Sequence, residues 1–298
     1  MRHIISIGDF DREWIDSLLD HADRIDGKQY DSHTLEGKIL AVLFFEPSTR
    51  TRLSFESAIA RLGGTSLTVG SVEACSIAKG ETLADTIRVV SGYADAIVIR
   101  HPKEGAARLA AEFSTVPVIN AGDGAGQHPS QTLLDLYTIR QSMPIDGIDI
   151  ALIGDLRYGR TAHSLASALS LYNARLHTLC PKGLELPETL SSRLAEQGME
   201  IIGHEDIADV IPAVDVLYVT RVQRERFPDS ASYFNVASSY RITPELLADA
   251  KKHLIVLHPL PRVDEIDPRV DEMPHAKYFE QSRNGVPVRM AMLMQVMQ

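Results

Sequence analysis

Short runs rich in β-branched residues alternate along this chain with longer amphipathic stretches, and this alternation constrains the fold more than any other feature. The runs that we predict to be strands are residues 38–45, 96–100, 116–120, 149–153, 175–179, 214–220 and 254–257. The intervals between them are long enough for crossover helices, which predicts an α/β fold with parallel sheets flanked by helices. Ligands of such folds bind beyond the carboxyl ends of the strands. Polar residues that directly follow a strand are therefore the first candidates for a functional site.

The length of the chain predicts two domains. Its 298 residues exceed the size at which one hydrophobic core usually keeps growing, so two domains of about 150 residues each are expected. The boundary is expected near a predicted helix at 131–143, because Pro144 to Gly147 is typical of a turn and a new series of strands and helices begins at Asp149. We place the first domain at 1–130 and the second at 131–283, each with its own parallel sheet, and expect the active site in the cleft between them.

Charge and cysteine content exclude several classes of function. The net charge of −10 and the pI near 5.5 argue against a nucleic-acid partner, because nucleic-acid binding needs a basic face. No window approaches the roughly 18 apolar residues of a membrane span, and the N-terminus has no basic stretch followed by an apolar run, so we expect a cytoplasmic protein without a membrane partner. Cys75 and Cys180 have no metal-ligand spacing, so neither a disulfide nor a bound metal is expected.

The first candidate anion site is the segment Pro47 to Arg52, which follows the first predicted strand and opens a helix that Gly63-Gly64 closes. Ser48 suits the N-cap position, and the backbone N–H groups of a first helical turn, with hydroxyls and guanidinium groups beside them, suit a phosphate. The alternative is an ordinary capped helix with two solvated arginines.

Two further segments follow strands in the first half. Arg100 ends one predicted strand, and the loop from Asn120 to Gln131 follows the next, with three glycines that let backbone approach a ligand closely. His128 in this loop could polarise a carbonyl oxygen. An exposed strand-end arginine and a solvated histidine are the alternatives. The loop around Lys79 is weak evidence by itself, because a lysine near a glycine is usually at the surface.

The second half repeats this placement of polar groups. Gly154 to Arg160 does not match the GxGxxG fingerprint, so no dinucleotide is expected. Thr220 to Gln223 and His258 to Arg262 each follow a predicted strand and carry groups that can hold carboxylates, although both could be simple strand exits.

Together these segments closely resemble the aspartate/ornithine carbamoyltransferase family from about Ile5 to Val296. The resemblance implies direct attack of an amine on carbamoyl phosphate, without cofactor or metal. It implies that the first domain binds carbamoyl phosphate, with the C-terminal helix 284–298 packing back on it, and that the second binds the amino acid. The residues that it assigns to carbamoyl phosphate are Ser48, Thr49, Arg50, Thr51, Ser76, Lys79, Arg100, His128 and Gln131. Those that it assigns to the amino acid are Lys79, Arg160, Arg221, Gln223, Pro259 and Leu260.

Four of these residues are implied to be catalytic: Arg50, Thr51, Arg100 and His128. The oxyanion would form near the last three, and most of the rate enhancement would come from orientation and electrostatic preorganisation. The family also implies a homotrimer in which Ser76 and Lys79 reach into the neighbouring subunit's site. Whether a separate regulatory chain binds is left open.

The second half favours aspartate over ornithine. The ornithine-specific branch is expected to carry a cysteine in place of Pro259 and an Asp/Ser-Met-Gly loop, whereas this chain has Thr220-Arg221-Val222-Gln223. Arg221 would repel the ammonium group of ornithine and attract a carboxylate of aspartate. The expected reaction therefore gives N-carbamoyl-L-aspartate and phosphate, an early step of pyrimidine synthesis. The alternatives are an ornithine carbamoyltransferase and a non-catalytic, anion-binding regulatory protein on the same fold.

Overall fold

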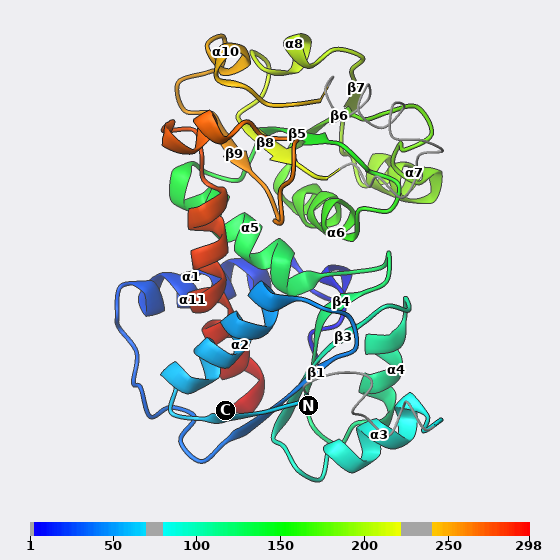
Figure 1. Cartoon of the computed structure of the whole chain (residues 1–298), viewed down its shortest axis with the longest axis vertical. Helices are drawn as coiled ribbons and strands as arrows, with labels where there is room; N and C mark the ends of the chain where they lie inside the picture. Colours follow the sequence, from blue (N-terminus) through cyan, green and yellow to red (C-terminus); the bar gives the residue numbers. More distant parts are fainter. Residues whose placement is uncertain (1–2, 70–79, 222–239) are drawn as a thin grey trace. The chain divides into compact units, whose positions relative to one another are not determined.

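The computed structural model describes residues 3–69, 80–221 and 240–298, and its contacts divide the chain into two compact units (Figure 1). Unit 1 comprises Met1–Tyr137 together with Arg283–Gln298, and unit 2 comprises Thr138–Ser282. The chain passes between the units within two helices, α5 (Pro129–Ser142) and α11 (Tyr278–Met297). The boundary that the sequence suggests between residues 130 and 131 falls within the same helix α5.

Unit 1 is built on a four-stranded, fully parallel sheet with the strand order β2-β1-β3-β4. Its strands are β1 (Ile39–Phe44), β2 (Thr65–Thr68), β3 (Ala96–His101) and β4 (Val118–Asp123). Its other helices are η1 (Ile7–Asp9), α1 (Arg12–Asp26), α2 (Thr49–Arg61), α3 (Leu83–Val90) and α4 (Ala106–Phe113). The three strands predicted in this half are confirmed, and β2 is an additional strand at the edge of the sheet.

Both faces of the unit 1 sheet are buried, which explains why β1 and β3 are almost continuously apolar. Successive side chains of a strand point to opposite faces. Ala41 and Leu43 accordingly belong to the core formed with Ile87 of α3 and Ala107 of α4, whereas Val42, which lies between them in the strand, is fully buried on the opposite face. The crossover helices thus enclose the sheet and leave its strand ends as the place where polar side chains gather.

Unit 2 contains a five-stranded, fully parallel sheet with the strand order β7-β6-β5-β8-β9. Its strands are β5 (Asp149–Ile153), β6 (Arg175–Leu179), β7 (Ile201–Gly203), β8 (Val216–Val219) and β9 (Ile255–Leu257). Its helices are α6 (Arg160–Leu169), η4 (Ser170–Tyr172), α7 (Glu188–Glu196), α8 (Ile207–Val210), α10 (Pro244–Leu247) and η6 (Pro268–Glu272). All four predicted strands are present, and β7 is an additional, partly exposed edge strand.

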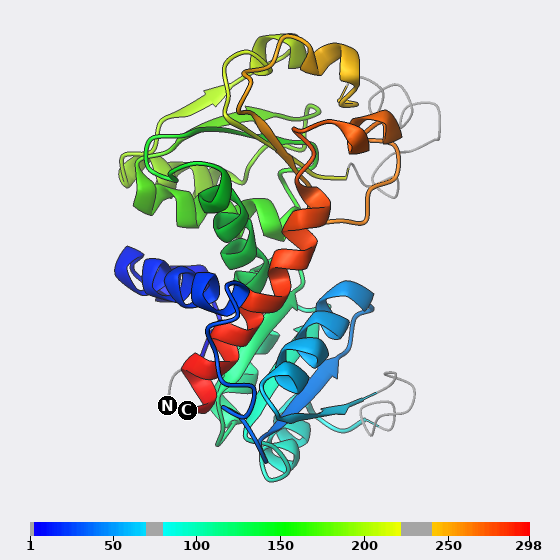
Figure 2. The ribbon, with the colours of Figure 1, turned by 90° about the vertical axis from the view of Figure 1, so that its left-hand side faces the viewer.

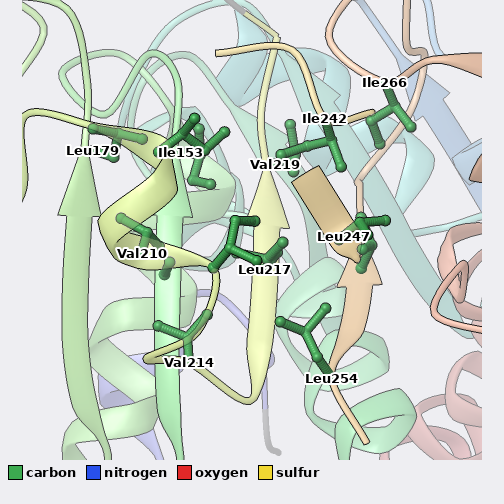
Figure 3. Close-up of a cluster of buried hydrophobic side chains, with 14 of the residues drawn as sticks. Ile153, Leu179, Val210, Val214, Leu217, Val219, Ile242, Leu247, Leu254 and Ile266 are labelled. Atoms are coloured by element: carbon green, nitrogen blue, oxygen red, sulfur yellow. The ribbon is translucent and has the colours of Figure 1, made fainter. Parts of the chain in front are cut away.

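A single apolar cluster covers one face of the unit 2 sheet. Figure 3 shows Ile153 of β5, Leu217 and Val219 of β8, and the surrounding Val210 and Leu247, pointing toward one another. Burying a side chain of this size contributes roughly 1.5–3 kcal/mol each before the entropy of ordering it is counted. This face holds β5, β8 and β9 in register, and their carboxyl ends are the ones that carry the candidate residues.

Candidate active site

Three candidate segments of unit 1 follow three neighbouring strands. β1, β3 and β4 are adjacent in the sheet, and Phe44 at the end of β1 pairs with Arg100 near the end of β3. Because the strands are parallel, their carboxyl ends lie along one edge of the sheet. The structure therefore brings the start of α2, Arg100 and the loop after β4 to the same edge, as the sequence predicts.

The segment after β1 forms the first turn of α2. Ser48 occupies the predicted N-cap position in extended conformation, but its side chain makes no capping hydrogen bond. Thr49 and Arg50 are exposed, and Thr51 is buried. Partial desolvation lowers the pKa of Arg50 from its ordinary value, although the residue as a whole is exposed. An exposed helix start with hydroxyl groups and a cation beside it can hold a phosphate.

Arg100 is held between two neighbours in unit 1. Its side chain is 11% exposed, its Nη2 lies 3.3 Å from Glu46 Oε1, and its Nη1 donates a hydrogen bond to the carbonyl oxygen of Ala121 at 3.2 Å. The second contact ties the end of β3 to the neighbouring strand β4. The guanidinium is thus ordered and nearly enclosed, as a group that stabilises developing charge should be.

The loop after β4 is organised by two buried residues that the sequence analysis did not single out, Asn120 and Asp123. Asn120 Nδ2 donates to the carbonyl oxygen of Ile5 at 2.9 Å and to Asp123 Oδ1 at 3.0 Å. Asp123 Oδ1 also accepts from the Gln127 N–H, and Oδ2 accepts from the Gly105 N–H, both at 2.9 Å. The sequence signal for them was an asparagine and an aspartate in a strand that is otherwise without polar side chains, because buried polar groups need partners.

The predicted ligands His128 and Gln131 lie at the junction of this loop with α5. Both are buried, with 4% and 8% of their surface exposed. Gly124 makes the compact path possible: its φ is +52°, and a Cβ there would lie 2.6 Å from the Glu104 nitrogen. The sequence predicted the glycines for approach to a ligand, and the structure shows that at Gly124 the close approach is to neighbouring backbone.

In unit 2, Arg160, Arg221 and Pro259-Leu260 follow the adjacent strands β5, β8 and β9. Arg160 is the first residue of α6 and is half-buried, whereas Arg221 is exposed. Pro259 and Leu260 are half-buried and precede a cis Leu260–Pro261 peptide bond. The same principle that gathers the unit 1 candidates therefore gathers these at the carboxyl edge of the second sheet.

His258 fixes the backbone at Leu260. Its Nδ1 accepts the Leu260 N–H at 2.8 Å, so its Nε2 carries the proton toward Glu265 Oε1, 2.7 Å away. Burial acts to raise the pKa of Glu265, but the hydrogen bonds from His258 and from the backbone N–H groups hold this pKa below its usual range. The ionised carboxylate thereby locks the histidine and the loop.

Three candidate site residues, Ser76, Lys79 and Gln223, lie outside the described residues, and so does Cys75. Burial raises the pKa of the Cys180 thiol to about 11, which excludes a thiolate at neutral pH. Among the described residues, no group of three or more His, Cys, Asp or Glu side chains could hold a metal ion. No helix in the described ranges is long and apolar enough to cross a membrane.

Two parallel α/β units, each with cationic and polar residues at the carboxyl ends of three adjacent strands, define a class of protein that binds anionic substrates. Residues 2–141 match the carbamoyl-P binding domain, and residues 146–296 the Asp/Orn binding domain, of aspartate/ornithine carbamoyltransferases. The chain belongs to the aspartate/ornithine carbamoyltransferase family.

Three of the similar proteins are named as aspartate carbamoyltransferases or aspartate transcarbamoylases. An aspartate carbamoyltransferase catalytic subunit from Methanosphaerula palustris is 75% identical over 99% of both chains. The solved catalytic subunit of M. jannaschii aspartate transcarbamoylase is 54% identical, with a TM-score of 0.92 over 99% of this chain and 98% of that one. The Trypanosoma cruzi aspartate transcarbamoylase, solved in complex with carbamoyl phosphate and aspartate, is 41% identical, with a TM-score of 0.93 over 100% of this chain and 97% of that one.

Proposed function

We propose that this chain is an aspartate carbamoyltransferase, which transfers the carbamoyl group of carbamoyl phosphate to the amino group of L-aspartate. The products are N-carbamoyl-L-aspartate and phosphate, and the reaction is an early step of pyrimidine synthesis. The observation that carries this proposal is the repeated placement of anion-binding residues at the carboxyl ends of adjacent strands in both units. A dianionic phosphate and a dicarboxylate each need such cations, and arginine supplies both charge and a planar hydrogen-bonding geometry.

In unit 1, the carbamoyl phosphate is assigned to the start of α2 and the loop before α5. Its phosphate binds Ser48, Thr49, Arg50 and Thr51, and its carbamoyl group binds Arg100, His128 and Gln131. The buried setting of Thr51, Arg100 and His128 supports their role at the oxyanion, because fixed donors in a water-poor site stabilise developing charge without reorganisation.

In unit 2, the two carboxylates of aspartate are assigned to Arg160, Arg221 and Gln223. The attacking amine meets the backbone carbonyls of Pro259 and Leu260. The hydrogen bond from the Leu260 N–H to His258 holds the backbone of this segment in place. The amine attacks the carbonyl carbon, the oxyanion collapses, and phosphate leaves. Phosphate itself can accept the proton that the amine loses, so no protein nucleophile is required.

Ser76 and Lys79 are assigned to the active site of a neighbouring subunit in a homotrimer, and a cytoplasmic location is part of the proposal. Sedimentation of the purified protein tests for the trimer, and sedimentation in a cell extract tests for a larger assembly with a separate regulatory chain.

The test of the reaction is a colorimetric assay for the carbamoylated amino acid, with carbamoyl phosphate and either L-aspartate or L-ornithine. Carbamoyl aspartate is expected, with no more than background from ornithine. Preference for ornithine would overturn the substrate assignment, and no product from either amino acid would support a non-catalytic anion-binding protein.

A further inference from the structure

A line of buried polar side chains leads from helix α11 to Gln131, the residue assigned to the carbamoyl group. Gln131 Nε2 donates a hydrogen bond to Asp135 Oδ1 at 2.8 Å, one turn further along α5. Asp135 in turn interacts electrostatically with Arg289 of α11. Asp135 is fully buried and Arg289 is 3% exposed. All three residues belong to unit 1, where α11 runs beside α5 and α2 (Figures 1 and 2).

The contact with Asp135 determines which end of the Gln131 amide faces the ligand. An ionised carboxylate can only accept hydrogen bonds, whereas an amide has an NH₂ donor on one side and a carbonyl acceptor on the other. Gln131 must therefore direct its NH₂ group toward Asp135. Its Oε1 is left as the acceptor, and within the described part of the chain no protein group donates to it. An acceptor at this position suits a ligand that presents an NH₂ group.

Asp135 must be ionised to act only as an acceptor, and Arg289 supplies the counter-charge. A buried carboxylate without a cation would tend to take up a proton. Burial lowers the pKa of Arg289 to about 10, and the negative charge of Asp135 opposes that shift, so the guanidinium remains protonated at neutral pH. The pair is thus charged although it is removed from solvent.

Arg289 is itself held in one place by its neighbours. Its Cζ lies 5.1 Å from the centroid of the Phe55 ring on α2. A Cβ at Gly285, one turn earlier on α11, would lie 2.1 Å from Arg289 Nη1, so only glycine leaves room for the guanidinium in this position. The same arginine therefore interacts with α2, whose first residues are assigned to the phosphate, and with α5, which carries Gln131.

We propose that Asp135 and Arg289 are positioning residues that make Gln131 a hydrogen-bond acceptor, so that the site selects the carbamoyl NH₂ group over a methyl group of the same size. Acetyl phosphate differs from carbamoyl phosphate by this replacement. This inference rests on the proposed function, because it takes Gln131 as a ligand of the carbamoyl group.

The test is the selectivity of Asp135→Asn. The new side chain offers an NH₂ donor as well as a carbonyl acceptor, so it can pair with either end of the Gln131 amide, and Gln131 is no longer compelled to present its oxygen to the ligand. Calorimetry with carbamoyl phosphate, acetyl phosphate and inorganic phosphate should show carbamoyl phosphate affinity falling about tenfold, as for one lost hydrogen bond, with the other two nearly unchanged. Thr132→Val is the matched control, because Thr132 is fully buried on the same helix. It should keep the full selectivity.

A second variant guards against misfolding, because Asp135→Asn leaves a buried arginine without its counter-ion. The double variant Asp135→Asn, Arg289→Met removes both charges, which buried sites tolerate better than the loss of one. It should show the same loss of selectivity. In a Gln131→Ala background, Asp135→Asn should cause no further change in the ratio of the two affinities.

The outcomes separate this inference from the proposed function. If the wild-type protein makes carbamoyl aspartate but Asp135→Asn or the double variant keeps the full preference for carbamoyl phosphate, the positioning role is wrong and the function stands. A further fall in the ratio within the Gln131→Ala background would also refute it. A wild-type protein that neither binds nor uses carbamoyl phosphate would overturn the proposed function and this inference with it.

Discussion

At the residue scale, the described arginines differ in whether a carboxylate of the protein forms an ion pair with them. Arg175, Arg262 and Arg269 are each paired with carboxylates of unit 2. Arg50 and Arg221, by contrast, form no ion pair with any described residue. A guanidinium that no described carboxylate neutralises is open to an anionic ligand from that part of the chain, which is the property that both assignments require.

Arg50→Ala is expected to abolish useful binding of carbamoyl phosphate, because the remaining hydroxyl and backbone donors cannot replace a charged planar group. A loss of at least about 100-fold in affinity by calorimetry corresponds to one strong charge-assisted contact. Arg24→Ala, which removes an exposed arginine from α1, is the control and should bind normally. Unchanged affinity in Arg50→Ala would remove Arg50 from the site.

Arg221→Ala should raise the apparent KM for aspartate by about 10- to 100-fold while carbamoyl phosphate affinity stays within about twofold, because one carboxylate contact is lost. The control is Arg193→Ala, which removes an exposed arginine from α7 in the same unit. Steady-state kinetics and calorimetry together check the split. Parallel loss of both affinities would contradict the assignment of the two substrates to different units.

Glu265→Gln should make the free energy of unfolding less dependent on pH in the acid range. The folded pKa of Glu265 is lowered, so its ionised form contributes stability above the unfolded pKa of about 4.3, and this contribution disappears as the pH falls through the lower folded value. The variant should therefore be about 1–3 kcal/mol less stable at pH 7. The deficit should shrink as the pH falls through the lowered folded pKa, where the wild-type carboxyl also becomes neutral. Thermal melts at pH 7 and over a series of acid pH values, with Glu188→Gln as an exposed control, measure this; a pH-independent deficit would refute it.

At the element scale, the sequence predicted every long apolar strand but missed β2 and β7. Both are short edge strands, and their exposed residues lack an apolar run: Thr65–Thr68 reads TSLT, and Ile201–Gly203 has three residues. Their pairing depends on the neighbouring strand rather than on their own composition. Asn120, Asp123 and Asp135 were missed for a related reason, because their partners are distributed over loops, helices and the N-terminal segment.

Gly154→Ala should disrupt the junction of β5 and β8. Gly154 has a φ of +115°, and a Cβ there would lie 2.4 Å from the carbonyl oxygen of Thr220, the residue before Arg221. A stability loss above about 3 kcal/mol is expected, because backbone strain and a steric clash add. Gly147→Ala is the matched control, since its φ is +72° and a Cβ would meet nothing within 4 Å.

Denaturant unfolding of the two glycine variants separates the stability lost to the clash with Thr220 from the stability lost because alanine disfavours a positive φ. Gly147→Ala should lose about 1 kcal/mol or slightly more from the positive φ alone. The aspartate KM should rise only in Gly154→Ala, because the shift reaches Arg221 through Thr220. Equal losses of stability in the two variants would show that contact with Thr220 is unimportant.

At the scale of the whole molecule, the sequence predicted the fold class and the order of the candidate segments, and the structure places those segments at the strand ends. The domain boundary and the roles of the site residues stay predictions. Assembly depends on contacts between chains, which no intrachain pattern of strands and helices reports. The sequence's own evidence for it was confined to the resemblance around Ser76 and Lys79.

Mixing two inactive proteins tests the shared active site. Lys79→Ala and Arg50→Ala subunits, dissociated together and reassociated, should form hybrid trimers in which some sites combine an intact Lys79 from one chain with an intact Arg50 from another. Activity should reappear in the mixture although neither parent is active. Each parent, treated alone in the same way, is the control. Mixtures that remain inactive despite demonstrated subunit exchange would rule out sharing.

The division of unit 1 between the two ends of the chain has a consequence for biosynthesis. Residues 138–282 form unit 2 from one continuous stretch, whereas unit 1 needs Arg283–Gln298, which are synthesised after all of unit 2. Chains are made from the N-terminus at roughly 5–20 residues per second, and domains generally fold as units during that time. Unit 1 must therefore wait, with Asp135 lacking Arg289, while unit 2 can already fold. A chain whose synthesis stops between residues 282 and 298 would therefore hold all of the second unit but only part of the first.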